Sequence, residues 1–531
     1  MGASNRVWRR LFFAVLALCF ASSFDPVLLA QQATVPNPQF QAVRATILEA
    51  VKDGSVPSIS VAVAKDGKVI WEESFGWANR EKMIPATPHT MYSMASISKP
   101  ISTTGLMILV DQGKVDLKAP VNKYIAPSEL KAHEGNAADA TVTHLLNHTS
   151  GLPLHYSAFY LDEPQRQPPS FTESIRRYGI LVHPPGAVYQ YANFGFGLVD
   201  HIITKVSGRA FRDFMKTEVF LPLGMTHSCV DVEPALDEYQ AVRYDTRGNP
   251  VPFYISDHPG ASQVYSSAHD LIRFGLFHLK HTQPDQKQIL KPATIDLMKQ
   301  DSDPNPRNDR YGLAWFLRKG EYGYDVAWHT GSMNGTNTIL KFVPSEDIAV
   351  VVLINTASDL RQKLPNDIIG TLLPDYGAKW KAERDKPSPR REAFKPVPDL
   401  IGEWKGEIRT YEEVVPVLMI IQADGDVHVK IGNQMETLLN RVAFEDGFLS
   451  GTSFGTIPSG DARAHPHNIS YRLLLDGKRL SGYASTEFTA GRSYGNFSSY
   501  VRLEKQPATP PAVSASANDE VGRSAPADPR R

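Results

Sequence analysis

Ser96-Ile97-Ser98-Lys99 stands immediately before a helical pattern that continues to about Gln112. Residues three positions apart share a helix face, so Lys99 can reach the Ser96 hydroxyl. A serine hydroxyl is a weak nucleophile until a neighbouring base activates it, and a buried lysine can lose its charge and take part in proton transfer. The motif is short, however, and a solvated helix start explains it at least as well when it is taken alone.

Two further motifs follow along the chain. Tyr191-Ala192-Asn193 comes after the turn Pro184-Pro185-Gly186, and His329-Thr330-Gly331 closes a predicted strand. A tyrosine can act as a general base when cations stabilise its phenolate, and an asparagine offers both a donor and an acceptor. A strand-end glycine lets a substrate lie close to the backbone. Taken singly, a core tyrosine and a histidine beside a turn account for these residues.

Read in order, the three motifs resemble those of the serine β-lactamase/penicillin-binding-protein hydrolases. The similar branch contains class C β-lactamases, D-alanyl-D-alanine carboxypeptidases and related esterases, and the resemblance runs from about Gln39 to Tyr376. Three accessory stretches also look like this family: Leu145-Leu146-Asn147-His148-Thr149-Ser150-Gly151-Leu152, Leu221-Pro222-Leu223-Gly224-Met225 and Tyr265-Ser266-Ser267-Ala268-His269-Asp270-Leu271. Each motif is weak alone, but the ordered set is highly specific.

The resemblance implies a role for each catalytic residue. Ser96 is expected to be the acylated nucleophile, and Lys99 to accept or relay its proton. Tyr191 is expected to share that duty and to protonate the leaving group. The resemblance therefore implies a reaction through an acyl-enzyme, which water or another acceptor releases.

The resemblance also implies how a substrate is held. Asn193 is expected to hold the carbonyl side chain of the substrate, and Gly331 to line the strand on which the substrate lies. The backbone N–H groups of Ser96 and Ser332 are expected to form the oxyanion hole, where each donor is often worth a few kcal/mol of barrier. No metal and no cofactor is expected.

One residue departs from the pattern of many family members, which carry a lysine where this chain has His329. A permanent positive charge for gripping a substrate carboxylate is therefore missing near neutral pH. We expect an ester, amide or D-amino-acid peptide as substrate, with esterase and D-amino-acid peptidase or carboxypeptidase activity both open. Two alternatives remain: a penicillin-binding or scaffold protein with slow or lost turnover, and a β-lactamase.

The elements outside these motifs predict an α+β fold, because helices frame strands from both ends of the region. Helical patterns are expected at 40–51, 98–112, 268–279 and 359–373, and strands at 58–64, 69–75, 326–329, 336–343 and 348–354. Together with the resemblance, this predicts an antiparallel sheet flanked by helices, with a helical subdomain, over residues 38–380.

A second domain is predicted after a charged, proline-rich linker at 381–396. Residues 397–505 contain short alternating segments between Gly, Asn and Asp turns, typical of a small all-β domain. Gly402-Glu403-Trp404 is similar to the start of lipocalin-like barrels. The residues from 506 to 531 are rich in Pro, Ala and Ser, and we expect a disordered tail. A role for the β-domain in shaping the mouth of the active site is a hypothesis based on its attachment.

Composition excludes some functions, and residues 1–30 favour export. The 531 residues carry 56 Lys and Arg against 57 Asp and Glu, so no global field attracts nucleic acid or anionic lipid. Residues 1–30 resemble a secretory signal, with a basic start at Arg6, Arg9 and Arg10 and an apolar run at 11–20 that is too short for a stable membrane anchor. Periplasmic or extracellular location is expected, and oligomeric state is left open.

Of the two cysteines, Cys19 lies in this signal, and Cys229 is expected to be buried and unpaired.

Overall fold

The computed structural model describes residues 37–161, 167–231, 233–304, 307–387, 392–462, 467–488 and 495–507. The predicted signal at 1–30 lies outside these residues, as do the tail from 508 and residues 388–391 of the predicted linker. Within the described ranges, no helix has the length and apolarity needed to cross a membrane.

An eight-stranded antiparallel sheet forms the centre of the first part, in the order β13-β14-β15-β16-β17-β1-β2-β3. The strands are β1 (Ser58–Lys65), β2 (Lys68–Asn79), β3 (Ile84–Pro85), β13 (Arg310–Tyr311), β14 (Phe316–Glu321), β15 (Tyr324–Met333), β16 (Thr336–Val343) and β17 (Ile348–Ile354). Strands from the two ends of this part meet in the middle, where Val61 pairs with Val352. β17 is buried along its whole length because helices cover both faces of the sheet, and its sequence is accordingly a continuous apolar run.

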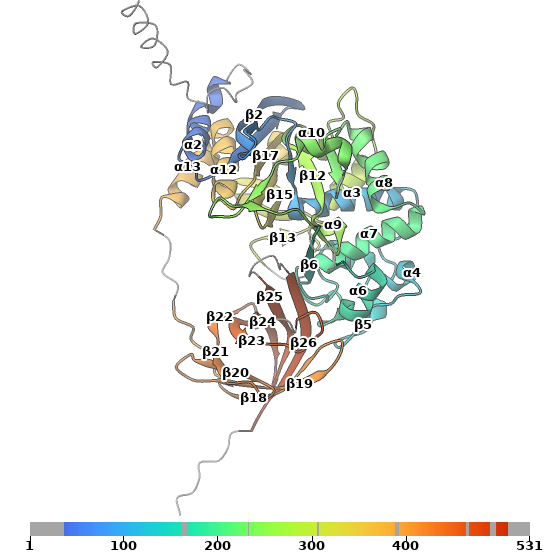
Figure 1. Cartoon of the computed structure of the whole chain (residues 1–531), viewed down its shortest axis with the longest axis vertical. Helices are drawn as coiled ribbons and strands as arrows, with labels where there is room; N and C mark the ends of the chain where they lie inside the picture. The colour runs from blue at the N-terminus through green and yellow to red at the C-terminus, as the bar shows by residue number, and fades with distance from the viewer. Residues whose placement is uncertain are drawn as a thin grey trace, which may run out of the picture.

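Helices from both chain ends cover one face of the sheet. They are α2 (Gln41–Lys52), α12 (Leu360–Leu372) and α13 (Pro374–Arg384), and they stand together in Figure 1. Ile47 of α2 and Leu364 of α12 are fully buried in the same core as Val352 of β17. Burial of these side chains fixes the two chain ends against the sheet.

The opposite face carries the helical part, which contains most of the larger core. The longest helices here are α3 (Ser98–Asp111), α7 (Asn193–Ser207) and α10 (Ala268–His278). Shorter ones are α4 (Asn122–Ile125), α5 (Val142–Leu146), α6 (Phe171–Tyr178), α8 (Phe211–Met215), α9 (Pro259–Ser262) and α11 (Pro292–Met298). A small sheet of β4 (Met91–Ser93), β12 (Val264–Ser267) and β8 (Ser228–Val230) lies beside α3, and β5 (Lys131–Ala132) pairs with β7 (Ile180–Leu181). Cys229 in β8 is free and buried.

The C-terminal part is a nearly closed, barrel-like sheet in the order β21-β20-β19-β18-β26-β25-β24-β23-β22. Its strands are β18 (Gly402–Arg409), β19 (Val414–Ile421), β20 (Val427–Ile431), β21 (Thr437–Leu438), β22 (Asn440–Glu445), β23 (Phe448–Gly455), β24 (His467–Asp476), β25 (Arg479–Phe488) and β26 (Gly495–Lys505). Trp404 is fully buried in its core and donates a hydrogen bond to the Leu400 carbonyl at 2.7 Å. The predicted fold class is confirmed in both parts of the chain.

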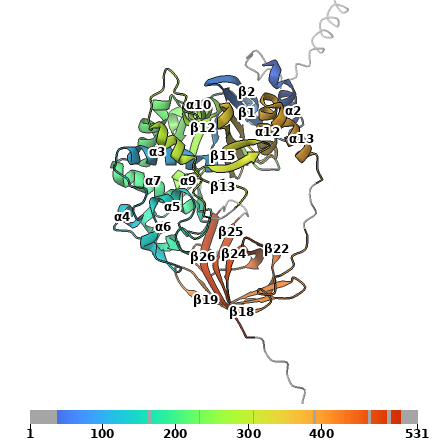
Figure 2. The ribbon, with the colours of Figure 1, turned by 180° about the vertical axis from the view of Figure 1, so that it is seen from behind.

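The two parts share a hydrogen-bonded strand. β26 pairs with β6 (Tyr156–Tyr160) through Gly495 and Asn496, and β6 pairs on its other side with β11 (Tyr254–Ser256). Figure 1 shows β6 at the upper ends of β25 and β26, and Figure 2 shows from behind that these ends lie against the helical part. The C-terminal sheet therefore continues into the helical part, towards α7 and α9.

Candidate active site

Ser96 lies in a single 3₁₀ turn, Ala95–Ile97, between β4 and α3. Its neighbours from Met91 to Pro100 are buried, whereas Ser96 itself is partly exposed. Ala95 holds a left-handed backbone with φ of 45°, a conformation that costs a residue other than glycine about 1 to 3 kcal/mol. The turn thus presents one hydroxyl from an otherwise closed surface, at the expense of local strain.

Lys99, the second residue of α3, contacts that hydroxyl directly. Its Nζ lies 3.1 Å from Ser96 Oγ and 3.1 Å from the carbonyl oxygen of Ala261 in α9. The side chain is fully buried, and in the described part of the chain it makes no ion pair. Burial therefore holds the pKa of Lys99 well below its usual value, which favours a neutral amine able to accept a proton.

Tyr191 precedes α7 and lies beside the amine. Lys99 Nζ is 4.8 Å from the centre of the Tyr191 ring. Burial raises the pKa of Tyr191, and a hydrogen bond with Ser96 acts in the opposite direction with smaller effect. The phenol is therefore protonated in the resting site and suited to donate, and the adjacent amine is the stronger candidate for the base.

β15 carries the third motif, and His329 is buried within it at 1% exposure. His329 Nδ1 lies 2.8 Å from the Thr330 carbonyl, and Nε2 lies 3.0 Å from the hydroxyl of Tyr311. A carbonyl can only accept, so Nδ1 carries the proton and Nε2 accepts from Tyr311. Burial, reinforced by Lys99, lowers the pKa of His329 to about 3, and the ring is neutral at physiological pH.

Gly331 brings β15 into direct contact with the turn that carries Ser96. A Cβ at this position would lie 2.1 Å from the Met94 carbonyl oxygen and 2.2 Å from Thr338 Oγ1. Ser332 follows, and its Oγ accepts a hydrogen bond from Asn337 Nδ2 at 3.0 Å. The close approach of the strand thus depends on a residue without a side chain.

A cavity of about 40 Å³ opens where these elements meet. Its lining residues come from the Ser96 turn, β6, α7, β11, α9 and β15: Ser96, Tyr156, Ser157, Ala158, Asn193, Ser256, Ser262, Ser332 and Met333. Ser96, Asn193 and Ser332 thus line one cavity, and Lys99 and Tyr191 lie beside Ser96. The assigned roles in catalysis, substrate binding and the oxyanion hole stay predictions.

Two residues contribute to the site without having been assigned a role from sequence. His148 Nδ1 accepts the N–H of Ala192 at 3.1 Å, and its ring centre is 4.2 Å from that of Tyr191. His148 belongs to the accessory stretch 145–152, so the sequence did carry a signal. Arg361 in α12 donates from Nη1 to the Gly331 carbonyl at 3.2 Å. Nothing in the local sequence marks Arg361, because the contact depends on how α12 packs.

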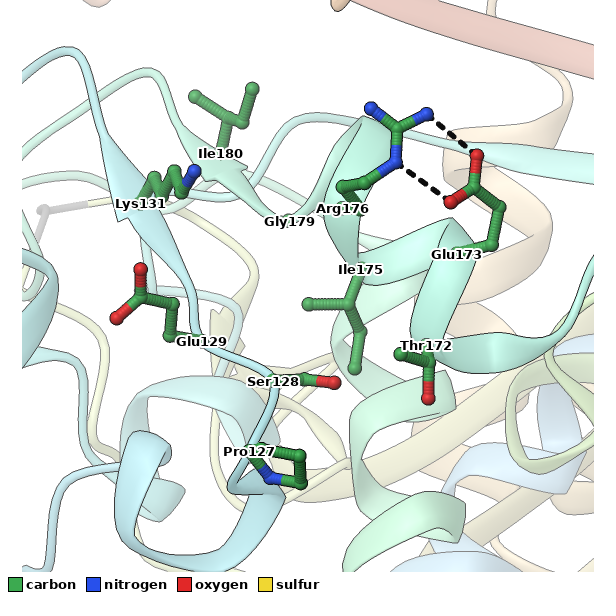
Figure 3. Close-up of a pocket in the computed structure, with 10 residues that line it drawn as sticks. All are labelled: Pro127, Ser128, Glu129, Lys131, Thr172, Glu173, Ile175, Arg176, Gly179 and Ile180. Atoms are coloured by element: carbon green, nitrogen blue, oxygen red, sulfur yellow. Dashed lines mark hydrogen bonds and ion pairs between the residues drawn. The ribbon is translucent and has the colours of Figure 1, made fainter.

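A second cavity, of about 260 Å³, lies between residues 127–131 and helix α6 (Figure 3). None of the predicted site residues lines it, and Glu173 and Arg176 on its rim are paired with each other. In the parts of the chain that the structure describes, no three or more His, Cys, Asp or Glu side chains are grouped so as to hold a metal ion.

The fold is that of the β-lactamase-like and penicillin-binding-protein-like proteins, and the Ser96–Lys99 pair lies at the junction of its sheet and helical part. The chain belongs to the beta-lactamase family: the family model described as Beta-lactamase matches residues 43–369, well over half of its length.

Curated proteins are similar to this chain at low sequence identity. Protein flp of Staphylococcus aureus (strain MRSA252) is 25% identical over 335 residues, which are 62% of this chain and 65% of that protein. Unguisins hydrolase ungD' of Aspergillus campestris (strain IBT 28561) is 28% identical over 323 residues, 57% of this chain and 59% of that protein. The chain thus spans less than two thirds of the length of these relatives.

Solved structures show the same fold. The octameric penicillin-binding protein homologue from Pyrococcus abyssi has a TM-score of 0.57 at 22% identity and covers 86% of this chain and 99% of its own. SurE gives a TM-score of 0.60 at 19% identity, with 88% and 99% covered. A class C β-lactamase gives 0.53 at 20% identity, with 63% and 96% covered. The first two likenesses therefore extend well beyond the residues that the β-lactamase shares.

Proposed function

We propose that the protein is an exported serine hydrolase that cleaves an ester or an amide through an acyl-enzyme on Ser96. The observation that carries this proposal is the fully buried Lys99 amine, 3.1 Å from Ser96 Oγ. A lysine held there without a carboxylate partner among the described residues is destabilised as a cation, so its amine is available to take the Ser96 proton when Oγ attacks. The proposal of export rests on residues 1–30 alone.

The proposed reaction proceeds in two halves. Lys99 takes the proton of Ser96 as Oγ bonds to the substrate carbonyl carbon, and the backbone N–H groups of Ser96 and Ser332 bind the resulting oxyanion. The Tyr191 phenol protonates the leaving group as its bond to that carbon breaks, and Lys99 returns a proton to Tyr191. Water then attacks the acyl-enzyme with the same groups in reverse roles, and Ser96 is released with its hydroxyl restored.

Many family members carry a lysine at the position of His329, where its charge can bind a substrate carboxylate. The surroundings of His329 favour a substrate that has no carboxylate at this place. His329 is neutral and its Nε2 is engaged by Tyr311, so it supplies no cation to the cavity. This supports an esterase, or a peptidase that does not bind a terminal carboxylate, over an efficient β-lactamase. One relative is named a hydrolase, which is consistent with turnover at this site.

Labelling with a fluorophosphonate and a fluorescent penicillin tests the nucleophile. We expect the wild type to be labelled and Ser96→Ala to remain unlabelled. Ser98→Ala is the matched control, because Ser98 Oγ accepts from the Val264 N–H at 3.0 Å and points away from the reaction. Absence of any Ser96-dependent label would overturn the proposal.

Turnover assays then separate the activities. Hydrolysis of short-chain p-nitrophenyl esters without cleavage of D-Ala-D-Ala peptides identifies the esterase, and the reverse result identifies the peptidase. Penicillin label that persists for hours without hydrolysis identifies a penicillin-binding protein. Ser96-dependent hydrolysis of a cephalosporin at a rate comparable to the best ester would contradict the interpretation of His329.

A further inference from the structure

The side chain of Gln190, the residue before Tyr191, leaves the active site and is bound by the C-terminal sheet. Its Nε2 donates to the hydroxyl of Tyr483 in β25 at 3.0 Å. Its Oε1 accepts from Nε of Arg472 in β24, also at 3.0 Å. Both ends of one amide are therefore held by a part of the chain almost 300 residues away.

The Tyr191 segment needs such support, because no helix or strand is formed between β7, which ends at Leu181, and α7, which begins at Asn193. The Gln190 N–H donates to the His148 carbonyl at 2.8 Å, and the Ala192 N–H donates to His148 Nδ1 at 3.1 Å. The backbone on either side of Tyr191 is thus fixed to His148. The Gln190 side chain adds the anchor that comes from outside the helical part.

The two groups that hold Gln190 are themselves well fixed. Tyr483 is 6% exposed and is paired in register with Arg472 on β24 and with Tyr500 on β26. The Arg472 guanidinium lies 3.9 Å from the centre of the Phe448 ring, where partial burial lowers its pKa. Because side-chain freedom is already lost at both positions, the bonds to Gln190 act as rigid restraints.

We propose that Gln190 is a positioning residue for Tyr191, and that it acts through a clamp formed with Arg472 and Tyr483. Through this Gln190 clamp the C-terminal sheet sets the position of the Tyr191 phenol relative to Ser96. The inference rests on the proposed function, since it assigns the sheet a part in that same reaction. It makes the C-terminal part a determinant of turnover as well as of stability.

Two neighbouring tyrosines provide a matched test. Tyr483 and Tyr500 face each other across β25 and β26, and the Tyr500 hydroxyl donates to Glu134, away from the Tyr191 segment. Tyr483→Phe and Tyr500→Phe therefore each remove one hydroxyl from the same interface. Of the two changes, Tyr483→Phe is the one that removes a hydrogen bond to Gln190.

Gln190→Ala is expected to lower kcat roughly tenfold or more, because a displacement of the order of 1 Å at a catalytic group can cost about a hundredfold. Tyr483→Phe is expected to lower kcat several-fold, with KM little changed. It is also expected to shift the pH profile of kcat in the same direction as Gln190→Ala does. Tyr500→Phe is expected to leave kcat and the pH profile unchanged while lowering Tm as much as Tyr483→Phe does. Gln190→Glu is expected to restore most of the rate, because a carboxylate accepts from both Arg472 and the Tyr483 hydroxyl.

An independent readout does not need turnover. In protein labelled with ¹³C at tyrosine Cζ, the Tyr191 signal is assigned by its loss in Tyr191→Phe. It is expected to shift in Gln190→Ala and to stay in place in Tyr500→Phe. Equal kcat losses in Tyr483→Phe and Tyr500→Phe, or an unmoved Tyr191 signal in Gln190→Ala, would overturn the clamp. Absence of any Ser96-dependent activity would instead overturn the proposed function, and the NMR comparison would still decide the clamp.

Discussion

At the scale of the residue, the fold works against the solvation of its most reactive groups. Lys99 is buried without an acidic partner among the described residues, and Ala95 beside the nucleophile is held in a left-handed conformation. Each feature lowers the stability of the folded chain. The same features produce an amine with a lowered pKa and a partly exposed hydroxyl, which are the properties that acyl transfer from Ser96 requires.

Lys99→Met is expected to abolish turnover and to raise Tm near neutral pH by roughly 3 °C or more, since it removes a buried amine and keeps the apolar volume. The pKa of Lys99 is lowered in the folded state, so the unfolded chain binds the extra proton. This proton uptake favours unfolding to its full extent at pH values below the pKa of Lys99 in the folded state. The effect disappears above the pKa of about 10.4 in the unfolded state. The Tm advantage of Lys99→Met over the wild type should therefore shrink as pH rises towards 10, measured by scanning calorimetry. An advantage that is constant across this range would show that Lys99 is not neutral in the folded protein.

At the scale of the element, the site depends on how tightly β15 packs on the 3₁₀ turn that carries Ser96. Gly331→Ala places a Cβ 2.1 Å from the Met94 carbonyl, so strand and turn must separate. We expect kcat/KM for the best ester to fall at least roughly a hundredfold, because the two proposed oxyanion donors lie on these two elements.

Gly195→Ala is the control for this change. The first contact of its Cβ, with the Leu145 carbonyl oxygen of α5 at 3.7 Å, is an ordinary van der Waals distance, and helix propensity favours alanine inside α7. Its activity and Tm should match or exceed those of the wild type. Equal activity in Gly331→Ala and Gly195→Ala would show that the close approach of β15 is not needed for catalysis.

Elements with strong local patterns could be predicted from the sequence, and those defined by tertiary contacts could not. Helices expected at 98–112 and 359–373 are found as Ser98–Asp111 and Leu360–Leu372. β25 was not predicted, because Arg479–Phe488 is rich in small polar residues. Tyr483 on the outer side of β25 contacts Gln190 of the helical part. Because this side of the strand does not face solvent there, polar and apolar residues do not alternate regularly along it.

The same distinction holds within the site. The spacing of Ser96 and Lys99 is local, and the structure places them in contact as the spacing predicts. The neutrality of Lys99 depends on burial by α9, and the environment of Gln190 depends on strands far along the chain. No pattern within a few residues of either position contains that information.

At the scale of the whole molecule, polar contacts at several points join the two parts, and the Tyr500–Glu134 hydrogen bond is one of them. β26 extends into β6, the Gln190 clamp reaches the Tyr191 segment, and Asp461 accepts from helix α6. β6 supplies Tyr156 to the cavity beside Ser96. One wall of the candidate active site is therefore continuous with the C-terminal sheet, and a role for the β-domain in shaping the mouth of the site stays a prediction.

Asp461 binds donors outside the Tyr191 segment, so it allows the mechanical role of the interface to be tested separately. Its carboxylate accepts from Arg177 Nη1 at 3.0 Å, from the Tyr411 hydroxyl at 2.8 Å and from the hydroxyl of Tyr178, which is buried. Asp461→Ala leaves all three donors without this acceptor, and a lost hydrogen bond to a charged group costs about 2 kcal/mol.

Because this loss falls on the interface, we expect Asp461→Ala to let the C-terminal sheet open locally before the rest of the chain unfolds. Hydrogen exchange should accelerate in β24 and β25 and stay unchanged in β1 and β17, and calorimetry should show a broadened or divided transition. Asp476→Ala is the control, since Asp476 pairs with Arg479 inside the C-terminal sheet and is exposed. Faster exchange of equal size in both variants, or in β17 as well, would mean that the two parts unfold as one unit irrespective of this junction. Selective opening in Asp461→Ala with kcat preserved would locate the catalytic influence of the sheet at the Gln190 clamp and assign Asp461 to stability alone.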